Sequence, residues 1–276
     1  MTDPKPAMSH YGRSDIVANI LAALPARPDG VRVKAEDLYP FDQLHGRELL
    51  ASRDHAARLS PHRDDRILDI GCGIGGPARL LAKTYGCRVT GLDITPQFIV
   101  AATELTELTG LSPLVHFDQG DATRMPYADS SFDAAICFYV GMNLPDKPAV
   151  LAEAHRVLKP GGRLLWTEAM ATGAATVTFP LPWASEAAGS HTVTQAGFEA
   201  MLKAAGFAIE AVIDETADHV ELARAAQLKG IAPPPATRVA NETVLGPEFI
   251  ERRRNYIGNL VAGALVSCLF EARRPS

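Results

Sequence analysis

The sequence predicts an α/β protein built on a parallel, doubly wound sheet, and three observations lead to this prediction. From Arg66 onward, short apolar segments alternate with amphipathic segments at a regular spacing, as strands and helices do in βαβ units. The first apolar segment ends in a cluster of glycines between Gly71 and Gly76. The 276 residues are 47% apolar and 21% charged, which provides enough apolar side chains for a sizeable core. This length allows one large domain or two small ones.

The N-terminal part is expected to be helical and to lie outside the sheet. Apolar residues of the segment 15–24 fall on one face of a helix that ends at a proline. Residues 26–40 have the composition of turns, and a second helix is predicted over about residues 43–59. We therefore divide the chain into an N-terminal helical unit, residues 1–60, and a main domain, residues 61–276.

The main domain is expected to hold seven strands. They are predicted at residues 66–71, 87–93, 114–122, 131–140, 163–170, 207–214 and 264–274. Helices are predicted at about residues 75–85, 97–108, 147–158, 194–206, 218–228 and 251–260. Thr95 and Pro96 supply the N-cap and the first residue of the second of these helices. Two less regular insertions, about 170–195 and 217–263, interrupt the pattern.

Charge and cysteine usage exclude several classes of protein. The chain has 27 Lys and Arg against 32 Asp and Glu, a net charge of −5, which opposes a nucleic-acid partner. Its four cysteines are scattered and, with its eight histidines, show no metal-ligand spacing. The sequence shows no signal peptide and no apolar run long enough to span a bilayer. We expect a cytoplasmic protein without a metal or a membrane partner.

The glycine-rich turn predicts a nucleotide-type cofactor. Gly71, Gly73 and Gly76 satisfy G-x-G-x-x-G between a strand and a helix, which lets backbone N–H groups approach a ligand closely. Asp93 follows Gly71 by 22 residues at the end of the next strand, where a carboxylate binds ribose hydroxyls. This pattern fits either a nicotinamide dinucleotide or S-adenosylmethionine (SAM).

Asp69 favours SAM over a dinucleotide. It stands two residues before the first glycine, beside the space that a pyrophosphate would fill, and two negative charges there would repel each other. The ammonium group of SAM instead needs an acceptor near this turn, which a carboxylate supplies.

Further motifs follow in order along the chain. They are Gly120-Asp121-Ala122, Ser131-Phe132-Asp133 and Leu158-Lys159-Pro160-Gly161-Gly162-Arg163. With the glycine turn, they resemble the class I SAM-dependent methyltransferases over about residues 60–215, most closely the ubiquinone/menaquinone-type, sarcosine-type and natural-product enzymes. The resemblance implies a Rossmann-like sheet of seven strands with helices on both faces and the last strand antiparallel. It also implies SAM as cofactor, S-adenosylhomocysteine (SAH) as product, and no metal.

The same resemblance implies which residues contact the cofactor. They are Asp69, Gly71, Cys72, Gly73, Asp93, Ile94, Gln97, Asp121, Ala122, Phe138 and Tyr139. The glycines would hold the methionine part, Asp93 the ribose and Asp121 with Ala122 the adenine, while Phe138 and Tyr139 would face the sulfonium.

The flanking segments imply an enclosed acceptor. Residues 1–60 resemble a helical lid, and the two insertions would roof the pocket. The pocket residues that we expect are Tyr11, Tyr39, Gln43, Asn143 and Trp183. The acceptor would be a small molecule of secondary metabolism, methylated on N, O, C or S, and the protein could form a homodimer.

Many relatives that methylate hydroxyls carry a histidine just after the fourth strand, but residues 139–146 contain none. A hydroxyl acceptor usually needs a general base, whereas a neutral amine or a thiolate does not. His45, His191 and Glu168 are the candidates elsewhere in the chain. We place His45 first because its segment resembles the lid.

Other functions fit the same motifs less well. A protein of this fold can use SAM structurally or catalyse a cyclisation, and the motifs do not exclude this. An NAD-dependent oxidoreductase is more remote because Asp69 opposes it. A methyltransferase acting on a macromolecule ranks below the small-molecule enzymes because the chain is acidic.

Overall fold

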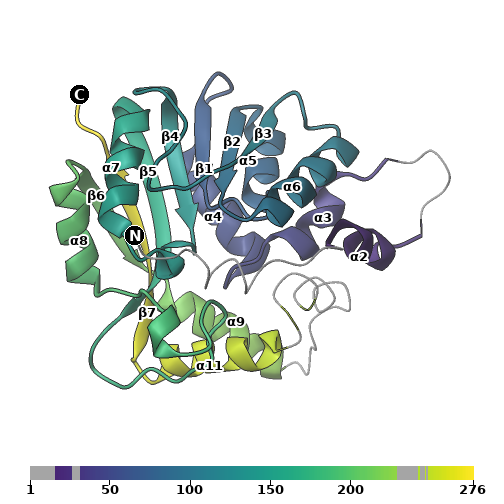
Figure 1. Cartoon of the computed structure of the whole chain (residues 1–276). Helices are drawn as coiled ribbons and strands as arrows, with labels where there is room; N and C mark the ends of the chain where they lie inside the picture. Colours follow the sequence, from purple (N-terminus) through teal and green to yellow (C-terminus); the bar gives the residue numbers. More distant parts are fainter. Residues whose placement is uncertain (1–15, 27–31, 229–241, 243–245, 247) are drawn as a thin grey trace.

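A seven-stranded sheet runs through the centre of the computed structural model, which describes residues 16–26, 32–228, 242, 246 and 248–276 (Figure 1). The strands are β1 (Arg66–Ile70), β2 (Arg88–Asp93), β3 (Val115–Gln119), β4 (Phe132–Phe138), β5 (Leu158–Ala171), β6 (Ala208–Asp214) and β7 (Leu265–Arg273). Their order is β3-β2-β1-β4-β5-β7-β6. All neighbours are parallel except β7, which is antiparallel to both β5 and β6. The predicted fold class is confirmed.

Helices cover both faces of this sheet (Figure 1). On one face lie α4 (Glu48–Leu59), α5 (Gly76–Tyr85) and α6 (Pro96–Leu108), and on the other α7 (Lys147–Val157) and α8 (Gln195–Ala204). Each face of the sheet has its own apolar core. Successive side chains of β1 point into opposite cores, since Ile67 packs with the first group of helices and Leu68 with the second. This alternation explains why the central strands read as continuous apolar runs.

The remaining helices lie around the carboxyl edge of the sheet. They are α2 (Ile16–Ala23), α3 (Ala35–Asp42), α9 (Thr216–Leu228) and α11 (Phe249–Val261), with short 3₁₀ turns at Gly141–Asn143 and Ala187–Gly189. Helices α9 and α11 pack against each other and against β7. None of the helices in the described ranges is long and apolar enough to cross a membrane.

The structure corrects two predicted boundaries in the N-terminal unit. Helix α3 occupies part of the segment that we expected to be turns, and α4 begins at Glu48 rather than at Gln43. The prolines of the segment predicted turns, yet Pro40 lies inside α3. The Asp37 carboxylate accepts a hydrogen bond from the Lys34 N–H at the start of α3, which supports the helix locally.

Strand β5 also begins earlier than predicted, at Leu158 instead of Arg163. The Lys159–Gly162 segment, which lies before the predicted strand, is part of the observed strand, and the register against β4 shifts there. Gly161 has φ +78°, so the backbone is turn-like at this residue although the strand continues through it.

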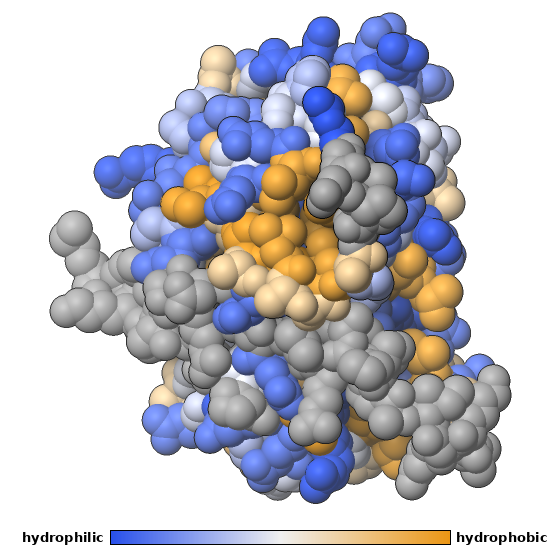
Figure 2. Space-filling model, turned by 90° about the vertical axis from the view of Figure 1, so that its right-hand side faces the viewer, coloured by the Kyte–Doolittle hydropathy of each residue, from blue (hydrophilic) through white to orange (hydrophobic). Residues whose placement is uncertain are grey.

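Figure 2 shows a group of apolar side chains on the side of the molecule where α2 and α6 lie in Figure 1. Helix α2 is apolar nearly all round, with Asn19 as its only polar residue, and Leu21 remains 36% exposed. Its inner face packs Ile16 and Ile20 against Phe98 of α6. The helix is therefore held by apolar packing, with part of its apolar surface left open.

A buried ion pair joins the N-terminal unit to the main domain. Asp42, at the end of α3, lies 2.9 Å from the guanidinium of Arg79 on α5, and both side chains are completely buried. Arg79 also donates to the carbonyls of Ile74 and Ala102 and to the hydroxyl of Thr106. These bonds satisfy much of the guanidinium, so the pair fixes where α3 ends.

We predict that Asp42→Asn lowers the free energy of unfolding by ~3–5 kcal/mol, because it leaves the buried Arg79 without a counter-charge. Glu36→Gln is the control: its partner Lys83 is 3.9 Å away and both side chains are about half exposed, so it should cost under ~1 kcal/mol. Urea denaturation of the three proteins measures both values. Equal losses in the two variants would contradict the anchoring role of the pair.

Candidate functional site

The loop after β1 brings backbone N–H groups to the carboxyl edge of the sheet. Gly71, Gly73 and Gly75 have φ values of +73°, +53° and +82°, a region that glycine enters without strain. The Gly71 N–H donates to the carbonyl of Leu92 on β2, which holds the loop against the neighbouring strand. A Cβ atom on Gly73 would meet nothing within 4 Å. Open space therefore lies in front of this residue, next to the N-terminus of α5.

Two carboxylates lie beside the loop. Asp93 accepts hydrogen bonds from the N–H groups of Gly73 at 3.0 Å and Thr95 at 2.9 Å. Asp69 is buried, and its Oδ2 atom has no hydrogen-bond partner in the described part of the chain. Burial raises the pKa of Asp69 to about 7, and the charge of Asp93 adds to this effect. An unpaired buried carboxyl oxygen is costly, so this atom suits a donor supplied by a ligand.

The other predicted cofactor residues lie along the same edge. The Gly120 N–H donates to the carbonyl of Asp93, which brings the loop after β3 to the end of β2. In that loop the exposed Asp121 carboxylate accepts from both the N–H and the hydroxyl of Thr123. Gln97 is exposed in the first turn of α6, Ile94 and Ala122 are half-buried, and Cys72 and Phe138 are buried.

Aromatic and imidazole rings gather where β4 ends. Tyr139 has φ +58°, which costs on the order of 1–3 kcal/mol for a residue other than glycine. Its ring stacks on His45 at 5.3 Å, and its hydroxyl lies 2.9 Å from Nε2 of His219 and 3.3 Å from Oγ of Ser267. The His219 ring lies 5.8 Å from that of Tyr256. Four segments that are distant in sequence thus converge on Tyr139.

Burial keeps this cluster neutral. It lowers the pKa of His45 to about 3 and that of His219 to about 4, although Glu215 opposes the shift of His219. Burial also holds the pKa values of the Tyr139 and Tyr256 hydroxyls well above their ordinary range. The Tyr256 hydroxyl and the Nδ1 atoms of both histidines have no hydrogen-bond partner among the described residues.

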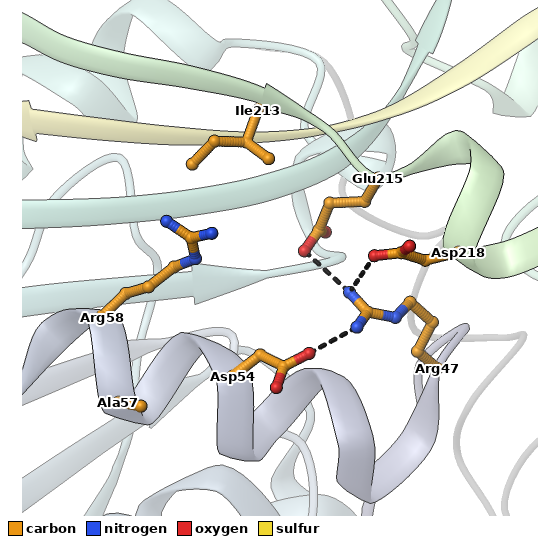
Figure 3. Close-up of a pocket in the computed structure, with 7 residues that line it drawn as sticks. All are labelled: Arg47, Asp54, Ala57, Arg58, Ile213, Glu215 and Asp218. Atoms are coloured by element: carbon orange, nitrogen blue, oxygen red, sulfur yellow. Dashed lines mark hydrogen bonds and ion pairs between the residues drawn. The ribbon is translucent and has the colours of Figure 1, made fainter.

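Arg47 fastens the segment before α4 to the start of α9 (Figure 3). Its guanidinium contacts Asp54, Glu215 at 3.0 Å and Asp218 at 3.4 Å. Glu215 also lies 2.8 Å from Nε2 of the buried His55. A pocket of about 360 Å³ opens here, lined by Arg47, Asp54, Ala57, Arg58, Ile213, Glu215 and Asp218. Because β6 ends at Asp214, this pocket lies at the carboxyl edge as well.

Glu168 and His191, two of the predicted proton acceptors, belong to another group of contacts. Glu168 Oε2 accepts from Nε1 of Trp166 at 2.7 Å, and Oε1 lies 3.8 Å from Nζ of Lys147. Burial raises the pKa of Glu168 to about 7, although Lys147 opposes this. The Lys147 ammonium group donates to the backbone carbonyl of His191. The backbone N–H of His191 donates to the carbonyl of Met142. These bonds tie the first insertion to the turn after β4.

The structure brings three of the predicted acceptor residues to this edge. Gln43 is buried, accepts a hydrogen bond from the Ser52 hydroxyl at its amide oxygen, and lies against the glycine loop. Asn143 ends the 3₁₀ turn that follows β4. Trp183 is buried, donates to the Ser190 hydroxyl at 2.9 Å and packs 5.7 Å from the ring of Tyr256.

Tyr39 is not brought to this edge, and Tyr11 lies outside the described residues. Tyr39 packs on Leu80 and lines a separate pocket of about 480 Å³ with Lys83 and Thr84, toward the C-terminal end of α5. The reason is the unexpected helix α3, which turns this side chain toward α5. The prediction that Tyr39 lines the acceptor pocket is therefore not supported by its position.

Sequence reasoning missed His219, Tyr256 and Ser267. His219 stands in a predicted helix within the second insertion, and nothing in its spacing connects it with the strands. Only the antiparallel return of β7 and the packing of α9 and α11 against it bring these residues to Tyr139. In the described ranges, no group of three or more His, Cys, Asp or Glu residues is arranged to hold a metal ion.

Comparison with known proteins finds that parts of this chain are similar to methyltransferases. Residues 68–166 match the family model of a methyltransferase domain. The chain is 32% identical over 226 residues to the methyltransferase phqN of Penicillium fellutanum, an alignment that covers 79% of this chain and 62% of that protein. The chain spans less than two thirds of the length of the first curated relatives that it matches.

Two solved structures share the fold over nearly the whole chain. A geranyl diphosphate C-methyltransferase from Streptomyces coelicolor A3(2) has a TM-score of 0.68 at 14% identity, covering 99% of this chain and 98% of its own. The cyclase SpnF has a TM-score of 0.63 at 24% identity, covering 95% and 94%. At these identities the likeness shows the fold alone.

We predict a pH-dependent stability that originates at Asp69. Because its folded pKa is raised to about 7, the native state keeps a proton that the unfolded chain releases near pH 4. The free energy of unfolding should therefore fall as the pH rises from about 4 to about 7, by on the order of 2–4 kcal/mol from this residue. Asp69→Asn should remove this part of the fall.

Urea denaturation at pH 5 and pH 8 measures the effect. Asp64→Asn is the matched control because Asp64 is exposed in the turn that precedes β1. The prediction fails if Asp69→Asn and Asp64→Asn change the difference between the two pH values equally.

Proposed function

We propose that this chain, a member of the SAM-dependent methyltransferases, transfers the methyl group of SAM to a small-molecule acceptor. The motifs from Asp69 to Arg163 stand in the order of that family, and the family model matches residues 68–166. SAM would supply an electrophilic methyl carbon on a sulfonium. The residues of this chain would bind the cofactor, orient it and enclose the acceptor.

One observation carries the cofactor assignment. The buried Oδ2 atom of Asp69 has no partner in the described part of the chain, and open space lies before Gly73 in the adjacent loop. A zwitterionic amino acid moiety fits this combination, because its ammonium group can donate to Asp69 and its carboxylate can face the helix N-terminus. A pyrophosphate would place negative charge beside Asp69 instead.

The remaining cofactor contacts follow from the positions of the loops. Asp93 is held by Gly73 and Thr95 with unused lone pairs on both oxygens, so we assign it to the ribose hydroxyls. We assign Asp121 and Ala122, with Ile94 and Gln97 across the cleft, to the adenosine part. Cys72 and Phe138 would contact the cofactor by packing, and Tyr139 would face the sulfonium.

The acceptor is proposed to lie next to Tyr139. His45 stacks on Tyr139, and Tyr256 packs against His219 in the same cluster of rings. Trp183, from the first insertion, packs against Tyr256 and would close the space. Such enclosure excludes water, and a neutral surrounding favours a reaction in which the sulfonium loses its charge. Of the predicted lid, residues 1–60, we propose that the segment between α3 and α4 covers this space, because Gln43 and His45 reach the site from there.

Among the candidates for a general base, the geometry favours the imidazoles at Tyr139. The oxygens of Glu168 face Trp166 and Lys147, and His191 contributes its backbone to the same contacts. His45 is neutral and stacks directly on Tyr139. A cytoplasmic location, a role in secondary metabolism and a homodimer stay predictions of the sequence.

We predict that SAH binds and that Asp69→Asn and Asp93→Asn each weaken it at least ten-fold, or ~1.4 kcal/mol. Asn at either position loses the charge that strengthens a hydrogen bond from an ammonium or a hydroxyl group. Gly73→Val should weaken SAH more strongly, because it fills the open space and strains the backbone at φ +53°. Calorimetric titration of folded protein measures each dissociation constant.

Asp118→Asn, on β3 outside the loop, is the control for loss of a carboxylate. Titration with NAD tests the remote alternative. Binding of NAD in place of SAH would contradict the proposal. Tight SAH binding with no methyl transfer to any acceptor would instead favour the alternative hypothesis that the protein catalyses a cyclisation.

A further inference from the structure

We propose that Tyr139 and His219 form a proton relay that serves an acidic hydroxyl acceptor, a phenol or an enol. This inference rests on the proposed function, and it names the class of acceptor. His219 lies in a helix of the second insertion, 80 residues beyond Tyr139, so the pair exists only in the folded chain.

The backbone at Tyr139 is strained. A bulky aromatic residue at φ +58° is held in an unfavourable backbone conformation, and such strain persists where the surroundings over-determine it, most often at functional sites. Here the surroundings are the ring of His45 on one side and the hydrogen bonds to His219 and Ser267 at the other end. These contacts fix the Tyr139 hydroxyl in one place.

His219 gives the proton of the Tyr139 hydroxyl a direction in which to move. The Nε2 atom of His219 lies 2.9 Å from the Tyr139 hydroxyl oxygen, and burial keeps the imidazole neutral by lowering its pKa. A neutral imidazole protonated on Nδ1 accepts the hydroxyl proton of Tyr139 at Nε2, and the Ser267 Oγ atom lies farther from the same nitrogen, at 3.1 Å. The Tyr139 oxygen then has lone pairs for the proton of an acceptor. Glu215, four residues before His219, favours the imidazolium that would form.

The charges around His219 indicate the kind of acceptor that the cluster suits. The charged groups that act on His219 are Glu215, Arg47, His55 and Arg253. Arg47 is already bound to Glu215, Asp54 and Asp218, and Arg253 is bound to Glu48. With these cations paired, the cluster suits a neutral acceptor better than a phosphate or a carboxylate. The rings of His45, Tyr256 and Trp183 favour a flat, aromatic one.

The proposed step balances in atoms and charge. The acceptor oxygen attacks the methyl carbon, so a C–O bond forms while the C–S bond breaks, and the sulfonium becomes the neutral sulfide of SAH. The acceptor proton passes to the Tyr139 oxygen as the Tyr139 proton passes to Nε2 of His219. The positive charge thus moves from sulfur to an imidazolium near Glu215. A phenol, with a pKa near ~10, suits this weak base better than an alcohol.

The experiment compares acceptors of one shape and different chemistry. Purified full-length protein is given methyl-labelled SAM with 1-naphthol, 1-naphthylamine or 1-naphthalenethiol, and with catechol and 2-hydroxy-1,4-naphthoquinone as further hydroxyl probes. We expect label on hydroxyl oxygen only. Tyr139→Phe and His219→Gln should lower this rate by about 10²-fold or more.

The pH profile separates a relay from a merely structural role. The wild-type rate should be nearly flat from pH 6 to pH 8, because His219 is already neutral there. In His219→Gln the rate should instead rise about ten-fold per pH unit, as only the ionised phenol reacts. A packing defect would lower the rate at every pH without changing the profile.

Tyr85→Phe and His155→Gln are matched controls, because both side chains are partly buried and lie outside the site. They should leave rate and profile unchanged. The relay would be overturned if label appeared only on the amine or the thiol. It would also be overturned if protein that binds SAH labelled none of the probes. Protein that folds but binds neither SAM nor SAH would overturn the proposed function itself.

Discussion

The buried ion pair between Asp42 and Arg79 is the constraint on which the organisation of the site depends. It fixes the end of α3 against α5, and Arg79 at the same time holds the carbonyl of Ile74 in the glycine loop. A Cβ on Gly76 would lie 2.0 Å from the carbonyl oxygen of Asp42. The third glycine of the motif is therefore needed for contact between two backbones, in addition to any role at the ligand.

From this anchor the chain crosses the carboxyl edge of the sheet. Residues 43–47 place the His45 ring on Tyr139, bring Gly46 against the ring of His219, and end with Arg47 at Glu215. One short segment thus contacts both the loop assigned to the cofactor and the cluster assigned to the acceptor. A disturbance at either end is expected to reach the other through packed backbone, without a flexible linker between them.

The sequence was informative where function depends on local backbone geometry. The glycine turn, Asp69 and Asp93 sit where predicted because each is fixed by a strand end and the turn that follows it. It was uninformative where the site depends on distant packing. Helix α3 was missed because Pro40 signals a break, which misplaced Tyr39. His219 follows β6, and it reaches Tyr139 only because β7 pairs with both β5 and β6. No local pattern encodes that approach.

The most direct test of the account is a crystal structure of the complex with SAH. We expect the ammonium nitrogen within ~3 Å of Oδ2 of Asp69, the ribose hydroxyls on Asp93, and the sulfur on the side of Tyr139. An ammonium group bound elsewhere, with Asp69 still lacking a partner, would contradict the cofactor assignment. A sulfur directed away from Tyr139 would separate the cofactor from the cluster of His45 and His219, and the acceptor site would have to lie elsewhere.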